Sequence, residues 1–164
     1  PNAQFGSIHK YAEIWSLAWS PDDSLIATSS EDQTTVIWNL AGEKLFTLRG
    51  HTTAVTSVDW QVMDINGQAV QILATCADDC TTRIYKHTPD TGKEPELLHI
   101  FNTSEVEEWH TLTYLALEPQ GKRLAVATQT GYVFLWNIET KDKLFGSKLH
   151  TGSIEGLRWN VEHK

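Results

Sequence analysis

Four segments of the chain share one pattern of large apolar residues, and their spacing restricts the folds available to it. The first and fourth positions of the pattern are apolar, and the sixth is apolar or aromatic. It occurs at residues 14–19 (IWSLAW), 55–60 (VTSVDW), 112–117 (LTYLAL) and 154–159 (IEGLRW), whose starts are 41, 57 and 42 residues apart. A repeat period of roughly 20 to 50 residues is typical of solenoids, propellers and similar arrays. The spacing therefore predicts repeated supersecondary units.

A second pattern follows the first three of these segments. It occurs at residues 25–39 (LIATSSEDQTTVIWN), 72–86 (ILATCADDCTTRIYK) and 123–137 (RLAVATQTGYVFLWN). Each copy has the composition of a strand, a tight turn with acidic residues or glycine, and a β-branched or aromatic strand ending in a large ring. Each copy therefore predicts a β-hairpin.

The ordered set of patterns resembles the WD40 repeats of β-propellers, and the resemblance covers nearly the whole chain. The Gly-His that opens such repeats is present as Gly50-His51, and His150 stands at the same offset before the last copy. The Trp-Asp ending of the repeat is present here as Trp38-Asn39, Tyr85-Lys86 and Trp136-Asn137. The resemblance implies an all-β, single, partial WD40 propeller with repeats at about 9–49, 50–104 and 105–148 and an incomplete one at 149–164.

The expected architecture is three four-stranded blades and the first strand of a fourth, at 153–159. The expected strands are 13–19, 24–29, 34–38 and 44–48 in blade one, 54–60, 70–76, 81–86 and 97–101 in blade two, and 111–117, 123–128, 132–136 and 143–148 in blade three. Two insertions, 61–71 with the turn signal Asn66-Gly67 and 87–96 rich in Pro, Asp and Gly, are expected to form surface loops. Residues 4–9 are expected to form the outer strand of a preceding blade.

Three blades and one strand do not complete a ring, because known propellers close with about four to eight blades. An open fan leaves an apolar blade face and unpaired strand edges at each end. We therefore expect part of a larger propeller, most simply a seven-bladed one, whose missing blades are supplied by the rest of the chain or by another chain. A self-contained ring of three blades is the least favoured alternative.

The resemblance further implies a polar tetrad in each repeat, made of a His before the inner strand, a Ser or Thr, a turn Asp and a Trp. A carboxylate can fix the tautomer of such a His, and a buried indole N–H needs an acceptor. Repeat two carries His51, Thr75, Asp79 and, in place of Trp, Tyr85. Repeat one carries Thr28, Asp32 and Trp38, with His9 one residue out of register. In repeat three Trp136 is present, but Thr130 and Glu108 replace the Asp and His, and Gly131 permits a positive φ in the turn.

The net charge of the chain indicates which classes of binding partner to expect. The 13 Lys and Arg residues against 21 Asp and Glu give a net charge of −8, which repels phosphate backbones and anionic lipid. Neither nucleic acid nor membrane is expected as a partner, and a basic protein segment is favoured. The two cysteines, in a chain with no transmembrane run or signal peptide, favour a reducing compartment, the cytoplasm or nucleus.

The sequence contains only weak candidates for catalytic or metal-binding motifs. Asp78-Asp79 beside His51 allows an acid–base pair or metal site, but a hairpin turn with a structural tetrad is the favoured interpretation. A zinc site needs four ligands and no second pair accompanies Cys76 and Cys80, which are expected to be a core and a turn residue. No nucleophile elbow, phosphate loop or zincin motif occurs. We expect no enzyme activity, metal or cofactor.

Most tryptophans have a structural explanation. Trp19, Trp60 and Trp159 alternate with Leu17, Val58 and Leu157 on one strand face, where they are expected to pack between blades. Trp15 and Trp109 do not fit this pattern.

In WD40 proteins, peptides dock on the face where the inner strands begin and the hairpin turns emerge. The resemblance implies that the corresponding residues of this chain are Glu13, Trp15, Glu31, Ala54, Thr56, Asp78, Thr111, Thr113, Gln129, Ser153 and Glu155. This set contains four acids and no Lys or Arg, so a basic peptide with an apolar or aromatic anchor would complement it. The predicted function is a non-catalytic scaffold that presents a rigid surface to protein partners. The alternative is a ligand-binding or enzymatic propeller with its site at the central channel.

Overall fold

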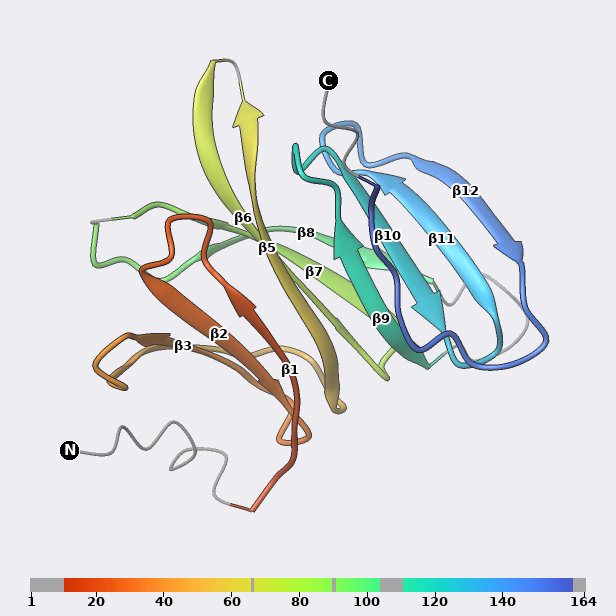
Figure 1. Ribbon diagram of the computed structural model, residues 1–164, viewed down its shortest axis with the longest axis horizontal. Helices are drawn as coiled ribbons and strands as arrows, with labels where there is room; N and C mark the ends of the chain where they lie inside the picture. Colours follow the sequence, from red (N-terminus) through yellow and green to blue (C-terminus); the bar gives the residue numbers. More distant parts are fainter. Residues whose placement is uncertain (1–10, 66, 90, 104–110, 161–164) are drawn as a thin grey trace.

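The computed structural model describes residues 11–65, 67–89, 91–103 and 111–160, and within them the fold is all-β (Figure 1). Three four-stranded antiparallel sheets follow one another along the chain, each a meander of consecutive strands. The strands are β1 Ile14–Trp19, β2 Leu25–Ser30, β3 Thr35–Asn39 and β4 Lys44–Leu48 in blade one; β5 Val55–Ile65, β6 Gln68–Ala77, β7 Thr81–His87 and β8 Glu96–Asn102 in blade two; and β9 Leu112–Leu117, β10 Arg123–Thr128, β11 Tyr132–Asn137 and β12 Lys143–Lys148 in blade three. The predicted propeller blades are confirmed.

The three sheets fan outward from the inner strands β1, β5 and β9, which lie next to one another at the centre of Figure 1. Val58 and Trp60 on β5 are buried against apolar residues of blade one, including Ile37. Leu115 and Leu117 on β9 are buried in the same way against blade two. Because burying apolar surface between the blades is the main driving force for their stacking, these inner-strand faces fix the order of the fan.

Blade one departs from this burial on its outer side. Leu17 and Trp19 on β1 correspond to Val58 and Trp60, yet they remain 53% and 50% exposed. No described element covers their face of the sheet. The prediction that alternate inner-strand residues pack between blades is therefore confirmed for blade two but not for blade one.

The first insertion of blade two is not a loop, and that prediction was wrong. β5 and β6 continue their pairing through it to the pair Ile65 and Gln68. Met63 and Val70 are buried in the core shared with blade three, so the alternation of a half-buried strand continues. The result is a hairpin that projects beyond the other blades (Figure 1). The second insertion does form a loop over the described residues between β7 and β8.

The predicted strand at 153–159 was also wrong, although the segment takes the place of an inner strand beside β9. The hydroxyl of Thr113 donates to the carbonyl of Ile154 at 2.6 Å, and the Ile154 amide donates to the Thr128 carbonyl at 3.3 Å. The indole of Trp159 donates to the carbonyl of Ala116 at 2.9 Å. A strand needs a ladder of backbone pairs. The described residues offer this segment no second strand to pair with, so it stays extended without a ladder.

Some predictions fall outside the described residues, namely the outer strand at 4–9 and the roles of His9, Glu108 and Trp109. No helix in the described part of the chain is long and apolar enough to cross a membrane.

Candidate functional site

The hairpin turn of blade two is held by a network around Asp79. The carboxylate of Asp79 accepts hydrogen bonds from the hydroxyl of Thr81 at 2.6 Å, from the Thr52 amide at 3.0 Å and from Nδ1 of His51 at 3.0 Å. Nε2 of His51 lies 2.9 Å from the hydroxyl of Thr75, which donates to it when Nδ1 carries the proton. Burial alone would raise the pKa of Asp79, but these hydrogen bonds outweigh it and hold the pKa well below its ordinary range. Tyr85, at the usual Trp position, is buried.

The other two turns keep parts of this arrangement. In blade one the indole of Trp38 donates to the hydroxyl of Thr28 at 2.8 Å, and Asp32 accepts hydrogen bonds from the amide and hydroxyl of Thr34. In blade three Thr128 lies 3.1 Å from Thr130, the residue at the Asp position. The indole nitrogen of Trp136 is buried without a hydrogen-bond partner among the described residues. A threonine hydroxyl cannot replace the several contacts of a carboxylate, so the network of this turn is reduced.

A set of single hydrogen bonds ties each inner strand to the next. The amide of Val58 donates to the hydroxyl of Ser16 at 3.4 Å, and the amide of Leu115 donates to that of Ser57 at 3.3 Å. The amide of Leu117 donates to the carboxylate of Asp59 at 2.7 Å. The inner strands diverge and form no backbone ladder with each other, so side chains satisfy their free amides. We call this set of bonds the inner-strand seam.

Each inner strand also contains a β-bulge at its start, and the bulged residues are Trp15, Thr56 and Thr113. A bulge leaves one residue unpaired and redirects its side chain. The hydroxyl of Thr56 donates to the carbonyl of Leu112 at 2.6 Å, as that of Thr113 does to Ile154. Both threonines therefore belong to the inner-strand seam. Trp15 takes no part in the seam and is 54% exposed.

The bulges open into a cavity of about 480 Å³, which we call the bulge cavity. Its lining residues come from all three blades and from the segment after blade three: Trp15, Thr56, Asp78, Thr111, Thr113, Tyr114, Gln129, Ser153 and Glu155. The structure thus gathers eight residues of the predicted docking face into one cavity. Glu13 and Glu31 lie outside it, bonded to each other through their backbones, and the Ala54 carbonyl accepts the Asp78 amide.

The bulge cavity is acidic. Asp78 and Glu155 are among its lining residues, and none of the described lining residues is a Lys, Arg or His. One carboxylate oxygen of Asp78 is buried and has no hydrogen-bond partner among the described residues. Burial, followed by the nearby charge of Asp79, raises the pKa of Asp78. A cation entering the cavity would lower the pKa of Asp78 again, because a positive charge stabilises the ionised carboxylate.

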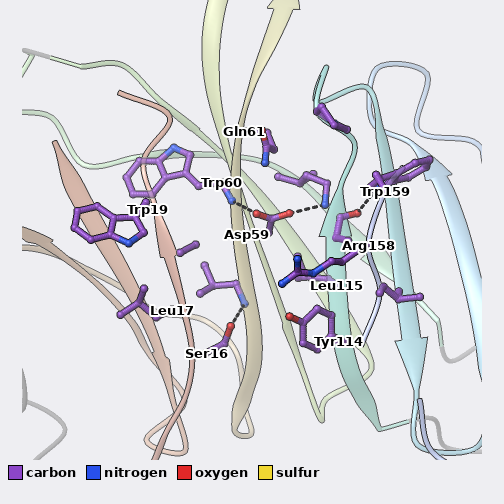
Figure 2. Close-up of a pocket in the computed structure, with 16 residues that line it drawn as sticks. Ser16, Leu17, Trp19, Asp59, Trp60, Gln61, Tyr114, Leu115, Arg158 and Trp159 are labelled. Atoms are coloured by element: carbon purple, nitrogen blue, oxygen red, sulfur yellow. Dashed lines mark hydrogen bonds between the residues drawn. The ribbon is translucent and has the colours of Figure 1, made fainter. Parts of the chain in front are cut away.

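A second cavity, of about 440 Å³, lies between the same inner strands, further along them than the bulges, and we call it the inner-strand cavity (Figure 2). Figure 2 shows Trp19 and Trp60 on one side and Tyr114 and Trp159 on the other. Among the described residues that line it, Asp59 is the one that carries a carboxylate. Its oxygens accept the amides of Trp60 and Leu117, at 2.8 and 2.7 Å. Burial raises its pKa despite these bonds.

Four contributors escaped the sequence patterns. Ser16, Ser57 and Asp59 belong to the seam, and polar residues alternating with apolar ones along the inner strands were the available signal. Tyr114 lines both cavities. It occupies the seam serine's place in the repeat, a substitution the pattern could have revealed.

The cysteines lie where they were expected. Cys76 is in the core and Cys80 is buried in the turn, with a positive φ of 62°. Burial raises the pKa of the Cys76 thiol to about 12, so it is a poor thiolate nucleophile. Across the described residues, no three His, Cys, Asp or Glu side chains are grouped as a metal would require.

Two family models match the chain. The family described as WD domain, G-beta repeat matches residues 4–39 and 42–86. The family described as Anaphase-promoting complex subunit 4 WD40 domain matches residues 96–162. Together they span all three blades and the segment that follows them.

Similar proteins include several larger ones. WD repeat and HMG-box DNA-binding protein 1 of Mus musculus is 24% identical over 91% of this chain and 13% of its own length. WD repeat-containing protein 1 of Gallus gallus is 27% identical over 92% of this chain and 23% of its length. Pre-mRNA-splicing factor cwf17 of Schizosaccharomyces pombe is 24% identical over 82% of this chain and 37% of its own length. The chain thus spans well under half the length of these relatives.

Proposed function

Since the chain belongs to the WD40-repeat family, whose members are in general protein-interaction scaffolds, we propose that it is a non-catalytic scaffold that docks a basic segment of a partner protein in the bulge cavity. The observation that carries this proposal is the meeting of an exposed tryptophan with two carboxylates from other repeats in one cavity. Trp15, Asp78 and Glu155 come from parts of the sequence far apart, and the fan alone brings them together.

The cavity has the chemistry of a binding hot spot. Tryptophan is enriched among residues that dominate interface energies, and Trp15 offers about half of its surface to a partner. Two carboxylates with no cation among the described lining residues favour a basic segment and speed its encounter with the protein. The rigid blades hold these groups in place, so little conformational freedom is lost when the partner docks.

The arrangement of the inner-strand cavity supports a non-catalytic role. A general base has to reach the proton that it takes from the substrate. Both oxygens of Asp59 already accept backbone amides, and the bonded His51 and Asp79 hold a turn together. The alternative of an enzymatic propeller predicts a bound metal or small molecule in a native preparation, near the inner strands.

We further propose a nuclear or cytoplasmic setting. The names of two relatives refer to DNA binding and to pre-mRNA splicing, both of which point to the nucleus. We propose that the partners of the intact protein are found in the same compartments.

The test compares two tryptophans of β1 in the intact protein. Trp15 lines the bulge cavity and Trp19 lines the inner-strand cavity, and their exposures are alike at 54% and 50%. Partner proteins captured by the wild type are expected to be lost with Trp15→Ala combined with Glu155→Lys. They are expected to be retained with Trp19→Ala, while circular dichroism shows both variants folded. Equal capture by wild type and the Trp15 variant would refute docking at this cavity.

A further inference from the structure

We propose that the bulge cavity is specific for an arginine side chain of the partner, whose guanidinium lies between Asp78 and Glu155 and stacks on Trp15. This inference rests on the proposed docking function and names the group that is recognised. It is carried by the places where the repeat is broken, by the acceptors around the cavity and by its aromatic residues.

The bulge position and its equivalent after blade three are occupied by Trp15, Thr56, Thr113 and Glu155 in the four modules. The two threonines close the inner-strand seam, each donating a 2.6 Å hydrogen bond to the next module. The tryptophan cannot make that bond in the same way, so its module gives up a stabilising contact. Glu155 carries a carboxylate in place of the hydroxyl at the equivalent position. Departures from a consistent pattern in a fold are expected at functional sites. Both departures line the same cavity.

The lining of the cavity is rich in hydrogen-bond acceptors. Asp78 contributes a carboxylate, and no cation is found among the described residues that line the cavity. Glu155 contributes a carboxylate, and Gln129 and Ser153 contribute further oxygen atoms. A guanidinium carries five N–H donors in one plane and no acceptor, so it can serve several of these groups at once.

The aromatic residues favour arginine over lysine. Trp15 and Tyr114 both line the cavity. A guanidinium stacks on aromatic faces and is weakly hydrated, whereas an ammonium is a compact and strongly hydrated point charge. A cavity of about 480 Å³ also accommodates a planar head group together with part of its apolar stem.

The experiment measures binding of peptide pools to the immobilised intact protein. Each pool has seven residues with random flanks and one fixed central residue: arginine, lysine, citrulline or norleucine. Citrulline keeps the planar shape of arginine but has no charge. We expect the arginine pool to bind about tenfold more tightly than the lysine pool. The citrulline and norleucine pools are expected to lose about 30-fold or more.

Variants assign the preference to the cavity. Asp78→Asn, Glu155→Gln and Trp15→Ala are each expected to weaken the arginine pool, while Glu139→Gln and Trp19→Ala leave it unchanged. Equal binding of the arginine and lysine pools, with both lost in Trp15→Ala, would overturn the arginine preference and leave the docking function standing. A preference for norleucine or citrulline, or binding of no pool above the level of Trp15→Ala, would overturn the inference. Capture of natural partners by the Trp15→Ala variant is measured separately and tests the docking function on its own.

Discussion

The turn of blade two depends on a single carboxylate that organises the groups around it. Asp79 accepts hydrogen bonds from His51, Thr81 and the Thr52 amide, and its pKa lies below the ordinary value of 3.8. A carboxyl group with a lowered pKa in the folded state stabilises the fold when it is ionised. Its contribution is complete above the unfolded-state value and declines as the pH falls toward the folded-state value.

The pH dependence of stability should therefore depend on Asp79. At pH 7, Asp79→Asn is expected to lower the free energy of unfolding by about 2 kcal/mol, because it removes charged hydrogen bonds. Urea unfolding of both proteins, followed from about pH 5 down to about pH 2, should show the difference between them shrinking, since below the ordinary pKa of 3.8 the unfolded chain binds a proton at Asp79 that the folded chain does not bind. A difference that stays constant over the whole range would contradict this role of the carboxylate.

Gly131 occupies a position in its turn where the fold leaves no room for a side chain. It has a φ of +87°, and an added Cβ would lie 2.0 Å from the carbonyl oxygen of His150. Gln33 and Cys80 take positive φ at the equivalent turn positions, so the left-handed conformation is common to all three blades. The sequence predicted this positive φ, but it could not reveal the close approach of His150, which arises from packing.

A pair of glycine variants tests this contact. Gly131→Ala is expected to lower the free energy of unfolding by at least about 1 kcal/mol, because alanine both strains the backbone and displaces His150. Gly152→Ala is the matched control, since nothing lies within 4 Å of its added Cβ. Thermal unfolding of the two variants measures the difference. A Gly131 variant as stable as the Gly152 variant would be inconsistent with the packing described.

Among the elements, strand positions followed closely from the sequence, and the ends that differ by more than one residue are those of β5 and β6. Hairpins of blades one and three were predicted by alternation and turn residues, which are local signals. The extension of β5 and β6 came from Met63 and Val70, whose burial depends on blade three. The segment at 153–159 has the strand pattern but no ladder, because pairing requires a neighbour that local sequence does not encode.

The hydrogen bond from the hydroxyl of Thr113 to the carbonyl of Ile154 attaches this last segment to blade three. Thr113→Val is expected to increase amide hydrogen exchange at 154–159, including the Ile154 amide, while exchange in β9 to β12 changes little. Thr113→Ser keeps the hydroxyl and should exchange like the wild type. Unchanged exchange in the valine variant would show that the seam bond does not hold the segment.

At the scale of the whole molecule, inner strands that cannot pair with each other are joined by side chains, and both cavities are lined by residues of these strands. Figure 2 shows the inner-strand cavity with two of the seam bonds. Of the predicted docking residues, the structure brings eight together, because equivalent positions in repeats necessarily converge on one face. Two of them, Thr56 and Thr113, turn out to donate seam bonds. The sequence could not separate seam residues from free ones, since that distinction depends on distances between blades.

The most direct test of the central claim is to restore the repeat at its two broken positions. The variant Trp15→Thr with Glu155→Thr gives every module the seam threonine, and both partner binding and the free energy of unfolding of the intact protein are measured. We predict that binding is lost while stability stays equal or rises by about 1 kcal/mol, because a new hydroxyl can donate to the next inner strand. Undiminished binding in a folded variant would contradict the claim that function lies where the repeat departs from its own pattern.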